Sequence, residues 1–144
     1  MIPQISQAPG LVQRVLNFLQ ALEQQGFTGD TATSYADRLT MATDNSVYQL
    51  LPDAILFPRS TADVALIARI AGEPRFASLV FTPRGGGTGT NGQALNRGII
   101  VDLSRYMNRI LEINTEQGWV RVEAGVIKDQ LNQYLKPFGY FFSP

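Results

Sequence analysis

The sequence predicts an α+β fold: a small parallel α/β layer followed by antiparallel strands, with helices at the N-terminus. Apolar runs that suit buried strands occur at residues 54–57, 78–81 and 98–102, and a helical pattern separates the first two. Residues 110–122 alternate between apolar and polar positions on both sides of a Gln-Gly pair, as an antiparallel hairpin does. The 144 residues are 44% hydrophobic and 17% charged, which is typical of a globular domain.

The first 47 residues are predicted to form a helical extension. A helix is expected from Pro9 to Gly26, because proline suits a first helical turn and glycine a C-terminal end. Its apolar positions recur at helical spacing: Leu11, Val15, Phe18, Leu19 and Leu22. A second helix is expected from Thr31 to about Met41, followed by an irregular connector. The domain division is therefore residues 1–47 and residues 48–144, with the boundary near residues 45–52.

The second part is expected to begin with a strand in residues 54–60 and a helix that Ser60 caps. Asp63 lies at the third helical position, so this helix start is close to a capping box. The buried stripe of the helix is predicted to consist of Val64, Ile67, Ala68 and Ala71. The next strand, residues 78–81, should end at Pro83.

The chain is expected to close with a helix from Val126 to Lys136, which Pro137 stops and whose core stripe is Leu131, Tyr134 and Leu135. Several aromatic residues follow: Phe138, Tyr140, Phe141 and Phe142. They would leave a large apolar surface to cover, so we expect the chain to be cut inside a larger protein and the fragment to self-associate. The alternative is a C-terminal strand docked in the core.

The composition argues against several classes of function and several kinds of site. Twelve basic and twelve acidic residues cancel, which argues against nucleic acid as a partner. No apolar run is long enough to span a membrane, and the N-terminus lacks the pattern of a signal peptide, so the expected location is cytoplasmic. The chain contains no cysteine and no histidine, which excludes a thiolate nucleophile, a histidine base and an ordinary zinc or iron–sulfur site within it. No catalytic residue and no metal ligand is therefore assigned.

The stretch PRGGGTGTNGQ, residues 83–93, carries five glycines within residues 85–92 and directly follows an apolar strand. Glycine leaves backbone N–H groups unshielded, and consecutive free N–H groups form a concave anion site that suits phosphate. Ligands of α/β folds bind at such strand ends. The loop is therefore predicted to bind phosphate, the alternative being a flexible surface turn. The predicted binding residues are Arg84, Gly85, Gly86, Gly87, Thr88, Gly89, Thr90, Asn91, Gly92 and Gln93.

Residues 87–92 match the pattern G-x-G-x-x-G, but the context differs from a Rossmann site. That site needs a helix to open inside the motif, whereas this loop leads into the strand of residues 98–102. Glu112, 20 positions after Gly92, falls in the hairpin instead of at the end of a second Rossmann strand. The chain has no Gly-Lys-Ser/Thr sequence either, so the loop indicates a different class of diphosphate site.

The loop closely resembles the diphosphate-binding loop of the FAD-linked oxidases of the vanillyl-alcohol-oxidase type, also called PCMH-type. The likeness extends over residues 48–71 and 98–144, including the stretch VEAGV at residues 122–126. Within that family the sequence is most similar to D-2-hydroxy-acid dehydrogenases of the D-lactate, glycolate and D-2-hydroxyglutarate types. Residues 37–60 are similar to the large members that fuse the flavin part to a C-terminal iron–sulfur part.

The resemblance implies the first half of a PCMH-type FAD-binding domain. The backbone from Arg84 to Gln93 would hold the FAD diphosphate, and Pro144 would approach the flavin. This chain has neither histidine nor cysteine to attach FAD, which is consistent with non-covalent FAD, the alternative being an attachment residue in the missing part. The intact protein would transfer a hydride from a D-2-hydroxy acid to the flavin, giving a 2-keto acid. An electron acceptor would be reached through iron–sulfur centres in the missing part, and the intact protein would be cytoplasmic or peripheral to the inner face of the membrane.

Two other functions stay open at this stage. The same loop could serve a non-catalytic module that binds a phosphorylated small molecule, or it could be a mere turn in an oligomerisation domain. For residues outside the loop the simpler roles are expected. Arg59 is expected to be a solvated charge at a helix start, the alternative being a contact to FAD or to a neighbouring domain. Tyr48 is expected to be a core or interface residue, the alternative being a role at the flavin edge. Asp102 and Glu123 are expected to be turn caps.

Overall fold

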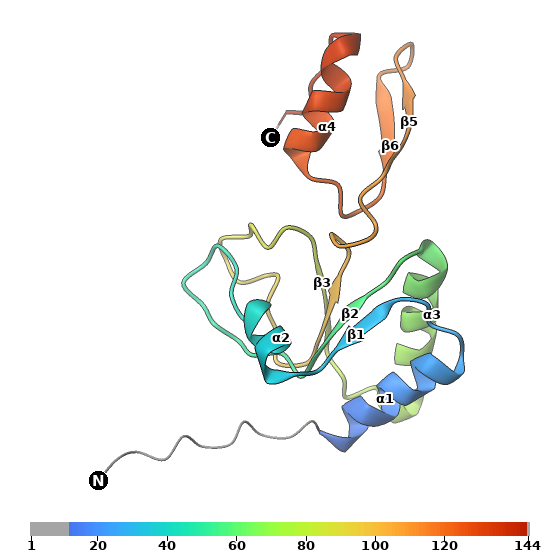
Figure 1. Cartoon of the computed structure of the whole chain (residues 1–144), viewed down its shortest axis with the longest axis vertical. Coiled ribbons are helices and arrows are strands. Elements are labelled where there is room, and N and C mark those ends of the chain that lie inside the picture. The colour runs from blue at the N-terminus through green and yellow to red at the C-terminus, as the bar shows by residue number, and fades with distance from the viewer. Residues whose placement is uncertain (1–11, 144) are drawn as a thin grey trace.

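The computed structural model describes residues 12–143 (Figure 1). Within this range, no helix is both long and apolar enough to cross a bilayer. The elements in chain order are α1 (Gln13–Gln24), β1 (Asp30–Ala32), α2 (Tyr35–Thr40), β2 (Ala54–Phe57), α3 (Thr61–Ala71), the 3-10 helix η1 (Pro74–Phe76), β3 (Phe81–Arg84), β4 (Ile99–Asp102), β5 (Ile110–Asn114), β6 (Trp119–Val122), α4 (Lys128–Leu135) and the 3-10 helix η2 (Lys136–Phe138).

A four-stranded sheet with the order β1-β2-β4-β3 forms the centre of the molecule. β2, β4 and β3 run parallel, and β1 pairs with β2 in the antiparallel direction. β5 and β6 form a separate antiparallel pair. The predicted α+β class, with a parallel layer followed by antiparallel strands, is confirmed.

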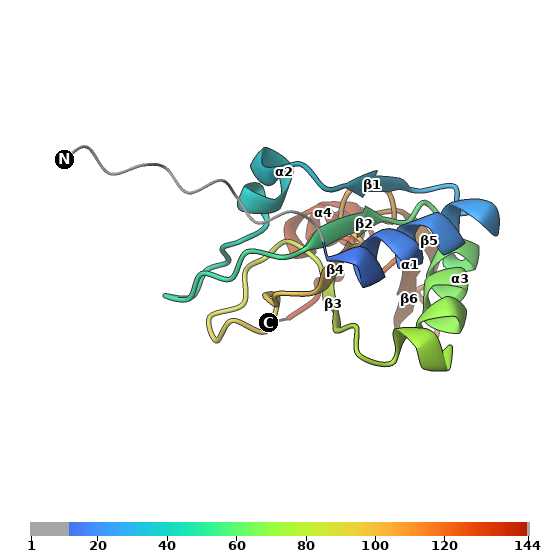
Figure 2. The same ribbon diagram turned by 90° about the horizontal axis from the view of Figure 1, so that it is seen from below.

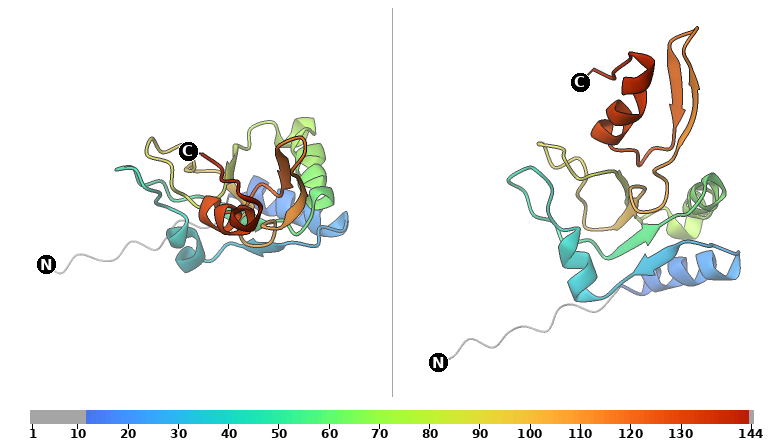
Figure 3. Two further views of the ribbon diagram at one scale, coloured as in Figure 1. Left: turned by 90° about the horizontal axis from the view of Figure 1, so that it is seen from above. Right: turned by 45° about the horizontal axis from the view of Figure 1, so that its top comes forward.

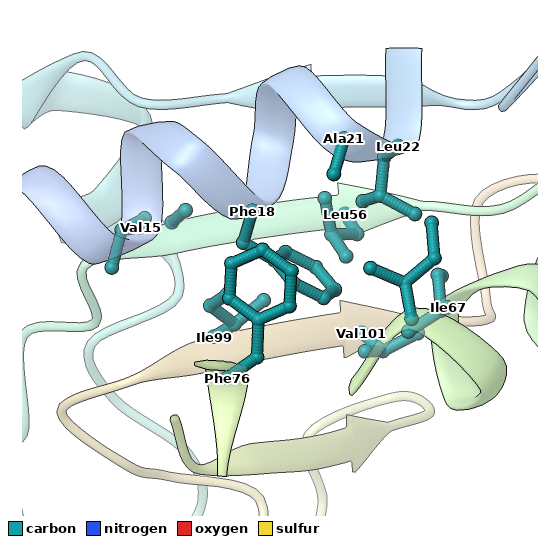
Figure 4. Packing of buried hydrophobic residues seen from close by; sticks show 11 residues of the cluster. Val15, Phe18, Ala21, Leu22, Leu56, Ile67, Phe76, Ile99 and Val101 are labelled. Carbon is teal, nitrogen blue, oxygen red and sulfur yellow. The ribbon is translucent and has the colours of Figure 1, made fainter. Parts of the chain in front are cut away.

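Helices α1 and α3 cover one face of this sheet (Figure 2). Phe18 of α1 is fully buried between Phe76 and Phe81, whose ring centroids lie 5.2 Å and 5.0 Å away. Around it, Leu56 of β2 and Ile99 of β4 point toward the helix (Figure 4). The N-terminal helix is thus part of the same hydrophobic core as the parallel strands.

The opposite face of the sheet carries a smaller cluster. Ile55 and Phe57 of β2 and Ile100 of β4 are buried there. Met41 and Tyr106 pack against them. All residues of β2 and β4 are therefore buried, which explains why both strands read as continuous apolar runs in the sequence.

Asp63 joins the start of α3 to the segment that precedes β1. Its Oδ1 accepts from the Thr28 N–H at 2.9 Å, and its Oδ2 accepts from the Thr28 hydroxyl at 2.8 Å and the Arg59 N–H at 2.9 Å. Ser60 caps the helix as predicted, because its Oγ accepts from the Asp63 N–H at 3.2 Å. Burial raises the pKa of Asp63, but the hydrogen bonds from Thr28, Arg59 and Ser60 outweigh it and hold the pKa below its ordinary value.

The β5–β6 hairpin and α4 form a unit that stands away from the sheet (Figures 1 and 3). Glu123 closes the base of the hairpin, because it forms an ion pair with Arg109 at 2.7 Å and accepts from the Arg109 N–H at 2.9 Å. Gly125 attaches the unit to the sheet: its N–H donates to Met107 O at 2.8 Å, and a Cβ there would lie 2.2 Å from Leu103 O.

The C-terminal aromatic residues are exposed, as the sequence predicted. Tyr140, Phe141 and Phe142 expose 45%, 73% and 55% of their surface. Together with Ile113 and Trp119 they line a small pocket of about 100 Å³ on the hairpin unit. Self-association of the chain through this surface stays a prediction.

Two elements differ from the sequence prediction. Residues 30–32 form strand β1, so the helix expected from Thr31 exists only as α2, which Ser34 caps by accepting from the Asp37 N–H. The strand expected at residues 78–81 lies instead at Phe81–Arg84 as β3, so Pro83 does not end it but lies inside it, opposite Val101. β3 is an edge strand, where a residue without an N–H group is tolerated.

Two side chains assigned to helix cores are exposed instead. Ala68 is exposed in α3, whose buried positions are Asp63, Ile67 and Ile70. Tyr134 exposes 41% of its surface in α4 and packs against Phe138 at a centroid distance of 5.9 Å. The helix predicted from Pro9 to Gly26 is present as α1, Gln13–Gln24. Its expected start at Pro9 lies outside the described residues.

Replacing Asp63 with asparagine is expected to destabilise the chain by about 3 kcal/mol, because an amide NH2 would face N–H and O–H donors that now reach a carboxylate. Urea unfolding measures this change. Asp129→Asn is the matched control: Asp129 also lies in the first turn of a helix but is exposed. It should cost less than about 1 kcal/mol. Equal losses in the two variants would contradict the assigned role of Asp63.

The contribution of Asp63 should also depend on pH. Its pKa is lowered in the folded state, so its stabilisation is complete above the ordinary value of 3.8 and is lost as pH falls through the folded pKa. The difference in unfolding free energy between the wild type and Asp63→Asn should therefore be constant near neutral pH and shrink from about pH 4 downward. Urea unfolding at a series of pH values tests this, and a difference that grows at low pH would contradict it.

Candidate functional site

The glycine-rich loop leaves the sheet at the carboxyl end of β3 and returns to the start of β4. Since β3 and β4 are parallel neighbours, the chain must run back the length of the sheet between them. Residues 85–98 make this return without a helix or strand. The loop therefore lies at the edge of the sheet where parallel α/β layers bind ligands.

Arg84 lies beneath this loop. Its side chain is buried, and its Nη2 donates to Thr43 O at 2.9 Å. A Cβ at Gly87 would lie 2.3 Å from the same Nη2, and Gly87 has a φ of +66°. Glycine is required there for both reasons: a side chain would meet the guanidinium and strain the backbone. Within residues 12–143, the buried Nη1 of Arg84 has no hydrogen-bond partner.

The far end of the loop is anchored by Asn96, which is buried. Its Nδ2 donates to Thr82 Oγ1 at 2.6 Å, and its Oδ1 accepts from the Gly98 N–H at 2.7 Å. Between the two anchors, the Asn91 N–H donates to Gln93 Oε1 at 3.0 Å. Side chains at the ends of the loop thus fix its path while its middle stays exposed.

The middle of the loop presents a row of free donors. None of the backbone N–H groups of residues 85–90 donates to an acceptor within the described part of the chain. The Thr88 and Thr90 side chains in the same stretch are exposed. Consecutive free N–H groups above a buried guanidinium create positive potential, which suits a diphosphate.

A second loop, residues 43–49, lies against the glycine loop (Figure 3). Its Asp44 carboxylate accepts from the Ser46 N–H at 2.9 Å. The hydrogen bond from the Ser46 hydroxyl lowers the pKa of Asp44, against the effect of burial, and Ala94 N–H and the charge of Arg84 lower it further. The pKa of Asp44 thus lies below its ordinary value mainly because of its hydrogen bonds within the 43–49 loop.

Of the predicted site residues, Arg84 ends β3 and is buried, and residues 85–93 follow it in one continuous loop at the sheet edge. Pro144 lies outside the described residues. Sequence reasoning missed Asp44 and Asn96, which fix the surroundings of the loop. A polar residue just before the Arg-Gly pair at the loop end was the available signal for Asn96. Nothing local marked Asp44 as part of the site, because Arg84 and Ala94, which also influence it, are remote in sequence.

Two residues outside the glycine loop, Asp102 and Arg59, have partners that explain their positions. Asp102 caps the turn after β4, because its Oδ1 accepts from the Ser104 N–H at 2.9 Å and from the Ser104 hydroxyl at 2.8 Å. Arg59 at the start of α3 forms an ion pair with Asp30 at 3.0 Å and lies over the Tyr106 ring at 4.4 Å. Both residues therefore have structural partners away from the glycine loop.

Comparison with known proteins decides the family. Residues 52–144 match the family described as FAD binding domain. The chain belongs to this family. It is 85% identical, over all 144 residues, to the D-2-hydroxyglutarate dehydrogenase of Escherichia coli (strain K12). The chain spans only 14% of the length of that relative.

Solved structures share the fold of this FAD-binding domain. Alkyldihydroxyacetonephosphate synthase superposes with a TM-score of 0.74 at 20% identity, over 92% of this chain and 26% of the other. p-Cresol methylhydroxylase superposes with a TM-score of 0.67 at 16% identity, over 90% of this chain and 26% of the other. The resemblance to the PCMH-type oxidases, seen first in the sequence, is confirmed at the level of fold.

Replacing Gly87 with alanine is expected to lower the unfolding free energy by about 1–2 kcal/mol, because the left-handed backbone becomes strained and the added methyl group meets Arg84. Gly85→Ala is the control: nothing lies within 4 Å of a Cβ at Gly85, and its φ is not positive. It should change stability by less than about 0.5 kcal/mol. Urea unfolding compares them, and equal effects would show that the loop is not held as described.

Proposed function

We propose that this chain is the diphosphate-binding part of a FAD-dependent dehydrogenase that oxidises a D-2-hydroxy acid, with D-2-hydroxyglutarate as the substrate, to the 2-keto acid. The observation that carries the proposal is the row of free N–H groups at residues 85–90 above the buried guanidinium of Arg84. The 85% identity to a relative named D-2-hydroxyglutarate dehydrogenase supports the choice of substrate.

The residues of the loop fit the diphosphate of FAD. Its glycines leave the backbone open, and Gly87 and Gly92 hold the two positive φ values of the loop, +66° and +74°. The free N–H groups would bind the phosphate oxygens, and Arg84 would add positive charge from beneath. Thr88, Thr90, Asn91 and Gln93 would contribute side-chain donors.

FAD, when bound, supplies the acceptor for the two electrons released by oxidation of the hydroxy acid. The residues of this chain bind and orient the cofactor, and a base outside residues 1–144 would take the hydroxyl proton. The chain offers no histidine or cysteine for a covalent link, which favours non-covalent FAD. Pro144 is proposed to approach the flavin.

The remaining parts of the proposal concern a longer protein. The chain spans 14% of its Escherichia coli relative, which leaves room for a substrate domain and for iron–sulfur centres that pass electrons to an acceptor. We propose that the protein acts in the cytoplasm or on the inner face of the membrane. We propose the division into residues 1–47 and 48–144 as one of family match, which begins at residue 52, and not of hydrophobic core, because α1 and β1 pack and pair with the second part.

An absorption spectrum of the purified full-length protein tests this function. We expect visible flavin bands that bleach on anaerobic addition of D-2-hydroxyglutarate, because the substrate reduces the bound cofactor. L-2-Hydroxyglutarate is the matched control and should leave the bands unchanged, and D-lactate tests the width of the substrate class. A colourless protein that takes up no FAD but binds other phosphorylated ligands would instead support a non-catalytic binding module.

A further inference from the structure

The 43–49 loop lies outside the glycine-rich motif but shapes the same region. It connects α2 with β2 and projects from the sheet beside the glycine loop (Figures 1 and 3). A bridge between Thr43 and Gln49 and a hydrogen bond from the Leu50 N–H to Ala42 O at 2.9 Å close its base. The 43–49 loop is therefore a defined turn and has a fixed place against its neighbour.

The first contact between the two loops is at Gly87. The Asn45 N–H donates to Gly87 O at 3.1 Å, and Arg84 Nη2 donates to Thr43 O at 2.9 Å. The buried guanidinium thus touches the backbone of the 43–49 loop on one side and lies against Gly87 on the other.

The second contact is at Gly92. A Cβ at Gly92 would lie 3.0 Å from Cδ2 of Tyr48 and 3.8 Å from Oγ of Ser46. Ser46 Oγ also accepts from the Tyr48 N–H at 3.1 Å, which fixes the turn that carries the tyrosine. The Tyr48 ring therefore packs along the backbone of the glycine loop.

Only part of the Tyr48 side chain is buried by the packing between the two loops. The residue exposes 56% of its surface, and its hydroxyl has no hydrogen-bond partner among residues 12–143. The ring lies against Gly92, two residues beyond the free N–H groups of residues 85–90 in the same loop. An aromatic ring with an apolar body and a free polar tip at this place suits a dinucleotide, which combines flat rings with charged phosphates.

We propose that the 43–49 loop is the second wall of the FAD site, with Tyr48 as its contact residue and Arg84 as the positioning residue that holds the two loops together. This inference rests on the proposed function. Arg84 acts through the loops, because its guanidinium is buried below Gly87 and reaches the carbonyl of Thr43.

Amide hydrogen exchange of the full-length protein, with and without FAD, tests the proposal without any substitution. FAD should slow exchange in residues 85–93 and also in residues 43–49. Slowing in residues 85–93 alone would overturn the second wall and leave the proposed function intact. No slowing in either loop would overturn the proposed function itself.

Two pairs of variants test the named residues through the affinity of the full-length apoprotein for FAD, measured by flavin fluorescence. Tyr48→Ala should weaken FAD binding by about tenfold, which corresponds to about 1.4 kcal/mol. Tyr35→Ala is the matched control, because Tyr35 is a similarly exposed tyrosine on α2, and it should leave the affinity unchanged. An affinity of Tyr48→Ala within about threefold of the wild type would overturn the contact.

The substitution Arg84→Lys distinguishes the positioning of the two loops by Arg84 from the effect of its positive charge. Lysine keeps the positive charge but lacks the planar fork, so it should not restore the loop contacts. We expect weaker FAD binding and faster exchange in residues 43–49 of the apoprotein. Arg38→Lys is the control for loss of a buried arginine, since Arg38 donates to Pro52 O at 3.3 Å and both residues lie outside residues 43–49 and 85–93. Wild-type FAD affinity and exchange in Arg84→Lys would overturn the positioning role.

Discussion

The parallel pairing of β3 with β4 is the constraint on which the site depends. Successive parallel strands can be neighbours only if the chain returns the length of the sheet between them, and a helix makes that return in most α/β units. Here residues 85–98 make it as an irregular loop. A helix would have used its N–H groups in its own hydrogen bonds. The loop leaves those of residues 85–90 free to bind an anion.

An irregular return of this length needs other groups to order it. Arg84 and Asn96 provide them, because each is buried and each joins one end of the loop to a neighbouring segment. The 43–49 loop then braces the outer side at Gly87 and Gly92. Ordering the loop before a ligand binds lowers the entropy cost of binding, which is the advantage of a preformed site.

The family match gives this geometry its context. The chain belongs to the FAD-binding domain family and covers 14% of the length of its Escherichia coli relative. Its glycine loop leaves the N–H groups of residues 85–90 free, and the chain has no histidine or cysteine. In the function proposed above, this part holds the cofactor, and the base and the substrate contacts come from outside residues 1–144.

The sequence by itself determined the fold class, the parallel strands, the hairpin, the helix capped by Ser60 and the position of the glycine loop. These features follow from local patterns: apolar runs, alternation, capping residues and glycine content. Pro83 misled the strand prediction, because its effect depends on whether the strand lies at the sheet edge. The short strand β1 was also missed, since three residues that pair with β2 carry no periodic pattern of their own.

Only the tertiary structure decided what surrounds the loop. Arg84 is buried beneath Gly87, and its guanidinium contacts Thr43, which lies 41 positions away in the sequence. Tyr48 packs against Gly92. These contacts join segments that meet only when β2 and β4 pair, so no local sequence pattern predicts the contacts. The sequence therefore determined where the glycine-rich loop lies, and the folded sheet decided which remote residues pack around it.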